Sequence, residues 1–165
     1  MNSIVKQYFD KSSLLTIKNK FYADFCLEIF DLQIKQDIVE NDITSKIISG
    51  QYEVAKANII AKQSGIAAGI EEVVYLINKR TKLKTRQIIK DGVKIKNKDL
   101  LLELVGNPLE ILKFERTILN ILQRMSGIAT IANSLITKNL LSKALLKTCG
   151  MQHGHILKKL VQLFY

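Results

Sequence analysis

The sequence contains little of what marks several common protein classes. Its two cysteines, Cys26 and Cys149, lie far apart, and neither belongs to a Cys-x-x-Cys pair, which argues against a disulfide framework and against a zinc ribbon. No stretch approaches the roughly 20 consecutive apolar residues that a membrane helix needs. Residues 1–20 carry scattered lysine and aspartate instead of the apolar segment of a secretory signal. We therefore expect a cytoplasmic protein without a membrane segment.

Proline and arginine are also scarce. One proline and eight glycines in a chain that is 47% hydrophobic are typical of globular proteins. A length of 165 residues provides one core, or one small domain with part of a second. Only four of the 25 basic residues are arginine, and two of these, Arg116 and Arg124, lie in one motif. That placement indicates a need for a planar donor that can bind an anion through two hydrogen bonds.

The formal net charge of +10 predicts attraction to anions. Nucleic acid, anionic lipid, and phosphate or carboxylate substrates would all be attracted, and charge alone does not choose among them. The lysines are dispersed, and no set of aromatic residues accompanies them as a stacking surface for bases. We therefore expect no binding to nucleic acid.

The hydrophobic periodicity changes twice along the chain. Residues 1–40 have approximately helical spacing, and residues 53–62 alternate apolar and polar side chains as a strand does. From residue 109 the spacing is helical again. The region between contains a predicted helix and three further predicted strands, at residues 70–80, 83–89, 93–95 and 100–105. The pattern predicts an α+β fold with one small sheet.

Turn residues and glycines refine this prediction. Asp91–Gly92 and Asn97–Lys98 are typical of hairpin connections between neighbouring strands. Ser126–Gly127 is expected to kink or break the last helix, because glycine costs about 1 kcal/mol relative to alanine in a helix. Gly65 and Gly69 suit close packing of the backbone. A phosphate-binding loop is rejected there, because two acids follow in the first helical turn.

The motif at residues 115–130 joins these charged and small residues to a long apolar face. It closely resembles the signature of the quinolinate phosphoribosyltransferase family, the carboxylating nicotinate-nucleotide pyrophosphorylases. Four upstream segments match the family in the same order, and any one of them alone would be weak. These segments are residues 42–45, 57–72, 91–96 and 106–116.

The resemblance implies an N-terminal α/β sandwich domain, then a helical segment and the incomplete start of an α/β barrel. We accordingly divide the chain into an N-terminal helical segment (residues 1–40), the sandwich domain (41–108) and the helical junction with the start of the barrel (109–165). The enzymes of this family are homodimeric pentosyltransferases of NAD biosynthesis. With Mg²⁺, it converts quinolinate and phosphoribosyl pyrophosphate to nicotinate mononucleotide, pyrophosphate and carbon dioxide.

Arg116 is the one substrate-binding residue that the resemblance implies. It matches the family arginine that reaches into the neighbouring subunit and binds a substrate carboxylate, a contact for which lysine is a poor substitute. The alternative is an arginine paired with Glu110 or Glu115 on the helix surface. We expect Arg124 to be solvated or to lie on a dimer face, and Ser126 and Thr130 to cap and shape a turn. No catalytic residue and no metal ligand is assigned.

The resemblance fails downstream of the motif. The family has a Thr-Arg-Lys-Thr segment where this chain has Cys149, Gly150 and Met151 after Thr148, and its later strands are missing. Since an open barrel exposes unpaired edges, we expect a truncated chain that is inactive alone, for example through a frame disruption near Lys147. The DNA should then restore the family segments in another frame.

Three alternatives stay open at this stage. One is a paralogue of the same fold associated with molybdenum transport genes, and another is a non-catalytic remnant that serves in dimerisation. The third is a zinc site at Cys149, His153 and His155, which lacks a fourth ligand and is more readily explained as incidental.

Overall fold

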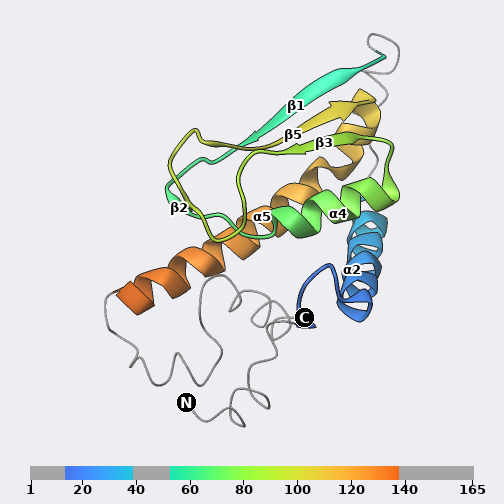
Figure 1. The fold of residues 1–165 in the computed structure, drawn as a ribbon. Coiled ribbons are helices and arrows are strands. Elements are labelled where there is room, and N and C mark those ends of the chain that lie inside the picture. The colour runs from blue at the N-terminus through green and yellow to red at the C-terminus, as the bar shows by residue number, and fades with distance from the viewer. Residues whose placement is uncertain (1–13, 39–52, 138–165) are drawn as a thin grey trace.

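The computed structural model describes residues 14–38 and 53–137 (Figure 1). The expectations for residues 1–13, 39–52 and 138–165, including the start of a barrel and the zinc site, lie outside the described residues. None of the helices in the described ranges is long and apolar enough to cross a membrane. In chain order the helices and strands are α2 (Lys20–Ile38), β1 (Ala55–Ile60), β2 (Gly65–Ile66), α4 (Ile70–Arg80), β3 (Lys84–Gln87), β4 (Lys94–Ile95), β5 (Leu100–Gly106) and α5 (Pro108–Thr137).

Helix α2 confirms the helical prediction for the described part of the N-terminal segment. Its buried face includes Phe30 and Ile34, and the Phe30 ring stacks on Phe114 of α5 with the ring centroids 5.8 Å apart. The Arg80 guanidinium of α4 donates two hydrogen bonds to the Asp31 carboxylate, at 2.8 and 2.6 Å. This pair lowers the pKa of Asp31, the hydrogen bond being the largest cause. Apolar packing and a bidentate ion pair thus fix α2 to both other helices.

The main sheet contains three antiparallel strands in the order β1-β5-β3. Half-buried and exposed side chains alternate along β1, as the sequence pattern predicts for a strand with one covered face. Leu102 and Leu104 of the central strand are almost fully buried on that face. On the opposite face Lys56 and Arg86 contact the Glu103 carboxylate, at 2.8 and 3.4 Å. Opposite charges across neighbouring strands therefore stabilise the uncovered face.

The hairpin predictions for Asp91–Gly92 and Asn97–Lys98 are wrong. Strand β4 pairs with β2 in a separate two-stranded sheet, and β3 pairs with β5. The Ala67 N–H donates to the Val93 carbonyl at 2.9 Å, and the Gly92 N–H donates to the Ala67 carbonyl at 2.8 Å. These contacts direct the segment after β3 toward the start of α4. The strands themselves were therefore predicted correctly, but which strands pair with one another depends on long-range contacts.

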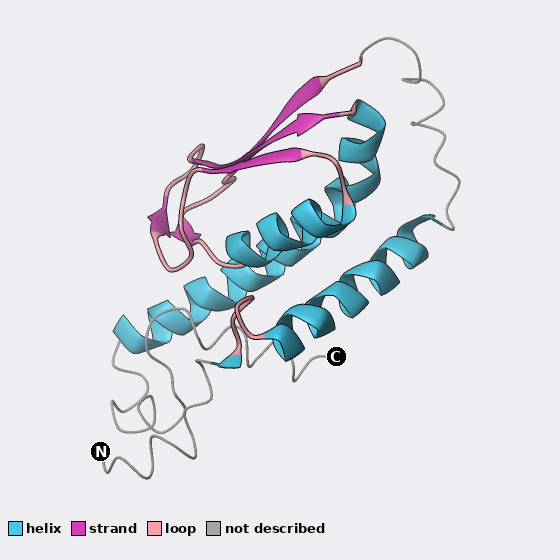
Figure 2. Cartoon of the chain, turned by 45° about the vertical axis from the view of Figure 1, so that its right-hand side comes forward, coloured by secondary structure: helices cyan, strands magenta, loops and turns pink. Residues whose placement is uncertain are grey.

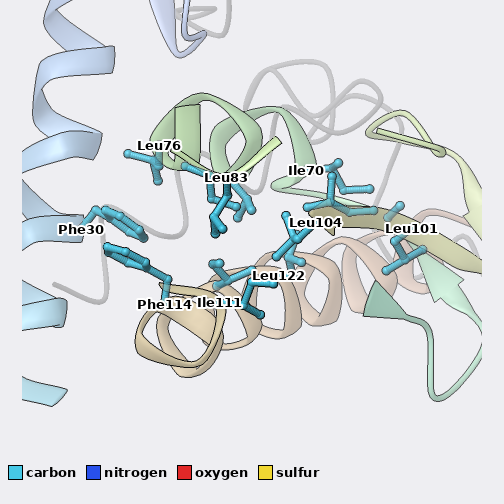
Figure 3. Close-up of a cluster of buried hydrophobic side chains, with 14 of the residues drawn as sticks. Phe30, Ile70, Leu76, Leu83, Leu101, Leu104, Ile111, Phe114 and Leu122 are labelled. Atoms are coloured by element: carbon cyan, nitrogen blue, oxygen red, sulfur yellow. The ribbon is translucent and has the colours of Figure 1, made fainter. Parts of the chain in front are cut away.

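All helices of the described residues lie on one side of the main sheet (Figure 2). Helices α4 and α5 cover the sheet, and α2 packs against both of them. The core formed between these layers is shown in Figure 3. Each fully buried leucine or isoleucine contributes about 1.5–3 kcal/mol through its removal from water. The described part is thus an open-faced α/β sandwich, as predicted, and the first half of α5 belongs to its core.

Helix α5 is a single α-helix from Pro108 to Thr137. Of the two expectations at Ser126–Gly127, a kink or a break, the break is therefore wrong. Its start follows the sequence prediction, since Pro108 occupies the first turn and Asn107 Oδ1 accepts a hydrogen bond from the Leu109 N–H at 2.8 Å. The Ser126 hydroxyl bonds to another segment. Tertiary contacts therefore override the weak helix propensity of serine and glycine.

Replacing Gly127 with alanine tests this continuity. A Cβ atom at Gly127 would meet nothing within 4 Å, so we expect the free energy of unfolding to rise by about 0.5–1 kcal/mol, because alanine loses less backbone entropy in a helix. Urea unfolding followed by circular dichroism would measure the change. A clear loss of stability would mean that the helix breaks at this position.

Candidate functional site

The side chains of the 115–130 motif divide between two faces of α5. Phe114, Ile118, Leu122 and Met125 are buried in the core. Four exposed residues fall on the other side at helical spacing, and they form a row along the helix. We call this row the polar face of α5, and it consists of Arg116, Asn120, Gln123 and Arg124. The motif therefore combines a buried structural face with an exposed polar face.

Arg116 lies on the exposed side of α5, a position that fits both the predicted role and the alternative of a surface arginine. Asn120 lies one turn further along the helix, and Gln123 and Arg124 follow after the next turn. A long side chain on a packed helix can project beyond the domain surface, while its Cα position stays fixed by the core. This placement agrees with a residue that acts outside its own domain. The role of Arg116 stays a prediction.

Ser126 and Thr130 hold a separate segment of the chain and do not shape a turn. The Ala68 N–H donates to Ser126 Oγ at 3.1 Å, and the Ser126 hydroxyl donates to the Ala68 carbonyl at 3.2 Å. The Ile66 N–H donates to Thr130 Oγ1 at 2.9 Å. The expectation of a turn was wrong because these hydroxyl groups bond to residues about 60 positions away. The Ser126 and Thr130 hydroxyl groups therefore stabilise tertiary structure.

Gly65 and Gly69 are required where the 65–69 segment crosses α5. A Cβ atom at Gly65 would lie 2.5 Å from Thr130 Oγ1, and one at Gly69 would lie 2.5 Å from Met125 Sδ. Gly69 also has a φ of +87°, which side chains other than glycine rarely adopt. The predicted close approach of the backbone is thus confirmed. The glycines fit the segment to the helix.

The N-terminus of α4 is already occupied by a carboxylate of this chain. Asp91 Oδ1 accepts a hydrogen bond from the Ile70 N–H at 2.9 Å, and Oδ2 accepts one from the Glu71 N–H at 3.5 Å. Glu71 and Glu72 add further negative charge in the first turn. This geometry agrees with the rejection of a phosphate-binding loop. It also shows which group satisfies the exposed N–H groups of the helix.

Asp91 is expected to make stability depend on pH. Burial raises the pKa of Asp91 from 3.8 to about 6, with a smaller contribution from the Glu72 charge. The native state holds the Asp91 proton more tightly than the unfolded chain does. The contribution of Asp91 to the free energy of unfolding is therefore most favourable below about pH 4, and it falls by roughly 2–3 kcal/mol as the pH rises past 6. Asp91→Asn keeps an acceptor for the Ile70 N–H and removes the charge.

Urea unfolding at several pH values would measure this effect. The stability of Asp91→Asn relative to the unsubstituted chain should rise between pH 4 and pH 7. Asp91→Ala serves as the matched control, because it also loses the helix cap and should be less stable than Asp91→Asn at every pH. A constant difference between Asp91→Asn and the unsubstituted chain over this range would contradict the raised pKa.

A pocket of about 460 Å³ lies between α2, α4 and α5. Its lining includes Tyr22 and Phe30 of α2, Glu72 of α4, and Asn120 and Arg124 of α5. The pocket therefore opens beside the polar face of α5. Sequence reasoning missed it, although an acid at position 72, among the buried residues of α4, was an available signal. In the described ranges, no three potential metal-ligating side chains gather.

A family model described as the N-terminal domain of quinolinate phosphoribosyl transferase matches residues 42–126. This match begins before β1 and ends within α5, and it contains the whole main sheet and α4. It covers more than half of the chain. The whole polar face of α5, including Arg116, lies inside it.

Curated relatives and solved structures give the same result. The chain is 33% identical over 115 residues to a probable carboxylating nicotinate-nucleotide pyrophosphorylase of Methanocaldococcus jannaschii, covering 70% of this chain and 40% of that protein. It is 29% identical over 112 residues to the protein of the same name from Methanothermobacter thermautotrophicus, covering 68% and 40%. The structure of the nicotinate-nucleotide pyrophosphorylase from Francisella tularensis superposes with a TM-score of 0.62 at 29% identity, covering 69% and 40%. The chain thus spans about two fifths of the length of these relatives.

Proposed function

Since the chain belongs to the quinolinate phosphoribosyltransferase family, we propose that it provides the N-terminal part of that enzyme of NAD biosynthesis. The reaction converts quinolinate and phosphoribosyl pyrophosphate to nicotinate mononucleotide, pyrophosphate and carbon dioxide, in the cytoplasm. The match to the N-terminal domain model supports this proposal. The excess of positive charge supports it as well, because both substrates are polyanions.

Arg116 is the proposed substrate-binding residue. Its exposed position on a helix that the core holds in place is the observation that carries this role. A guanidinium group can donate two parallel hydrogen bonds to one carboxylate of quinolinate, which a lysine cannot do. We propose that Arg116 acts in trans, in the barrel of a neighbouring subunit of a dimer. The 165-residue chain by itself is then expected to form no product.

Mg²⁺ is proposed to enter with phosphoribosyl pyrophosphate. The described residues contain no cluster of three potential ligands that would hold the ion, so they do not fit a resident metal site. What these residues supply is positive charge, including the Arg116 guanidinium group. Such preorganised charge stabilises anionic substrates and the leaving pyrophosphate.

The other readings of the sequence receive less support. The relatives bear the names of pyrophosphorylases, so the comparisons do not favour the paralogue associated with molybdenum transport. A non-catalytic remnant would keep the sandwich domain and its contacts with other subunits. It would differ from the proposed function in one respect, since its Arg116 would contribute nothing to turnover.

Native mass spectrometry would test the association that this proposal requires. The chain would be expressed together with the full-length enzyme of Methanocaldococcus jannaschii, and mixed dimers with one copy of each are expected. The chain alone should form no nicotinate mononucleotide from the two substrates in the presence of Mg²⁺. Product formation by the chain alone, or the complete absence of mixed dimers, would contradict the proposal.

A further inference from the structure

The face of the main sheet that no described helix covers (Figure 2) carries an excess of positive charge. In the strand register, Lys56 of β1 and Lys84 of β3 lie on either side of Val105 of the central strand. Arg86 follows Lys84 by two residues, so both side chains point to the same face. Glu103 is the one acidic residue in β1, β3 and β5. Three cations thus accompany a single carboxylate on this uncovered face.

Glu103 neutralises only part of that charge. Its carboxylate contacts Lys56 Nζ at 2.8 Å and Arg86 Nη1 at 3.4 Å. The hydrogen bond from Lys56 is the largest cause that lowers the pKa of Glu103, so this carboxylate is ionised at neutral pH. Lys84 is exposed and forms no ion pair with any described residue. An external anion can therefore contact Lys84 without displacing an internal partner.

The other end of the same face is apolar. The alternation of exposed residues along β1 places Ile60 on the same face as Lys56, and Ile60 is 42% exposed. Ile88 follows Arg86 by two residues, is 40% exposed, and donates its N–H to the Leu101 carbonyl at 3.0 Å. The uncovered face thus joins cationic groups at one end to apolar surface at the other.

These features favour an acidic polypeptide over other partners. The net charge of +10 opposes association with a second copy of this chain. The strands β1, β3 and β5 contain no aromatic residue on which a nucleic acid base could stack. Isoleucine side chains that are more than half buried do not project far enough to enter the apolar region of a lipid bilayer. A protein segment with both carboxylate and apolar side chains matches both ends of the face.

We propose that the uncovered face of the main sheet binds an acidic, partly apolar segment of another protein. Carboxylates of that segment contact Lys84 and Arg86, and its apolar side chains lie against Ile60 and Ile88. The sheet and the core separate this face from the polar face of α5. The site therefore does not use Arg116, and the proposal stands independently of the function proposed above.

Three related peptides would test the chemistry of this partner. Fluorescence anisotropy would measure binding of the full chain to a labelled peptide of repeated Glu-Leu-Glu-Ser units. Replacing every glutamate of the peptide with glutamine should weaken binding at least about tenfold, and replacing every leucine with serine should weaken it severalfold. Equal affinities for the glutamate and glutamine peptides, or no detectable binding of the glutamate peptide, would overturn the proposal.

Other anionic partners enter the same experiment as competitors. Oligothymidylate and phosphatidylserine vesicles should each displace the labelled peptide only weakly. Stronger competition by either of them than by unlabelled peptide would show that the face binds nucleic acid or lipid, and would refute the proposal.

Three variants connect binding to this face. Lys84→Glu should weaken binding of the acidic peptide at least about tenfold, and Ile60→Thr should weaken it severalfold. Lys113→Glu is the matched control, because it makes the same change of charge at an exposed position of α5, on the helical side of the sheet, and should change the affinity less than about twofold. Circular dichroism would show that each variant is folded. Equal losses for Lys84→Glu and Lys113→Glu would mean that only net charge attracts the peptide, and would refute this site.

Discussion

Replacing Gly69 with alanine is expected to lower the free energy of unfolding by about 3–4 kcal/mol. The left-handed conformation at Gly69 (φ +87°) costs a residue with a Cβ atom roughly 1–2 kcal/mol. The new Cβ would also lie 2.5 Å from Met125 Sδ and 3.2 Å from Met125 Cβ, and such overpacking costs about 1–3 kcal/mol. Urea unfolding followed by circular dichroism would measure the loss.

Gly92 offers a matched control for this experiment. Its φ of +85° is nearly the same, but a Cβ atom at Gly92 would meet nothing within 4 Å. Gly92→Ala should therefore cost only the conformational penalty, about 1–2 kcal/mol. The difference between the two variants isolates the contact between the 65–69 segment and α5. Equal losses would show that the close approach to Met125 contributes nothing.

Replacing Arg116 with alanine is expected to reduce turnover about 100-fold in a mixed dimer that depends on it. The mixed dimer contains this chain and a full-length relative in which the counterpart of Arg116 is alanine. Removing one partner of a desolvated ion pair costs about 2–5 kcal/mol, which corresponds to a factor of roughly 30 to 5,000 in rate. Arg116→Lys should retain part of the activity, since it keeps the charge and loses the bidentate geometry.

Arg124→Ala is the control for charge on the same helix face. It removes one positive charge two turns from Arg116, and we expect turnover of the mixed dimer to change less than about threefold. The mixed dimer must form to the same extent with each variant, as shown by native mass spectrometry. Equal losses for Arg116→Ala and Arg124→Ala would mean that general charge, rather than one guanidinium, supports the reaction.

Hydrophobic periodicity predicted the elements of the described fold except β2 (Gly65–Ile66), which lies in the glycine segment expected only to pack closely. The alternation along β1 and the helical spacing from residue 109 reflect which side chains face the core, and these are local properties of the sequence. The partner of β4 could not be predicted in this way. It depends on Asp91, whose carboxylate bonds to the start of α4 and thereby directs the segment toward the 65–69 segment.

The error at Ser126–Gly127 has a related cause. Propensity treats serine and glycine as helix breakers, but it does not include the bonds between Ser126 and Ala68. The two candidate sites also differ in whether a local sequence pattern reveals them. Arg116 was found from a local motif, whereas the pocket requires Tyr22 and Glu72, which lie 50 positions apart in the chain and meet only after folding.

The most direct measurement is the initial rate of nicotinate mononucleotide formation by a full-length relative that lacks the counterpart of Arg116, before and after this chain is added. The account predicts little product before the addition and a clear rise afterwards, in proportion to the mixed dimer formed, because Arg116 completes the site in the neighbouring barrel. Mixed dimers that form without any rise in rate would contradict the account, and would leave this chain a structural subunit only.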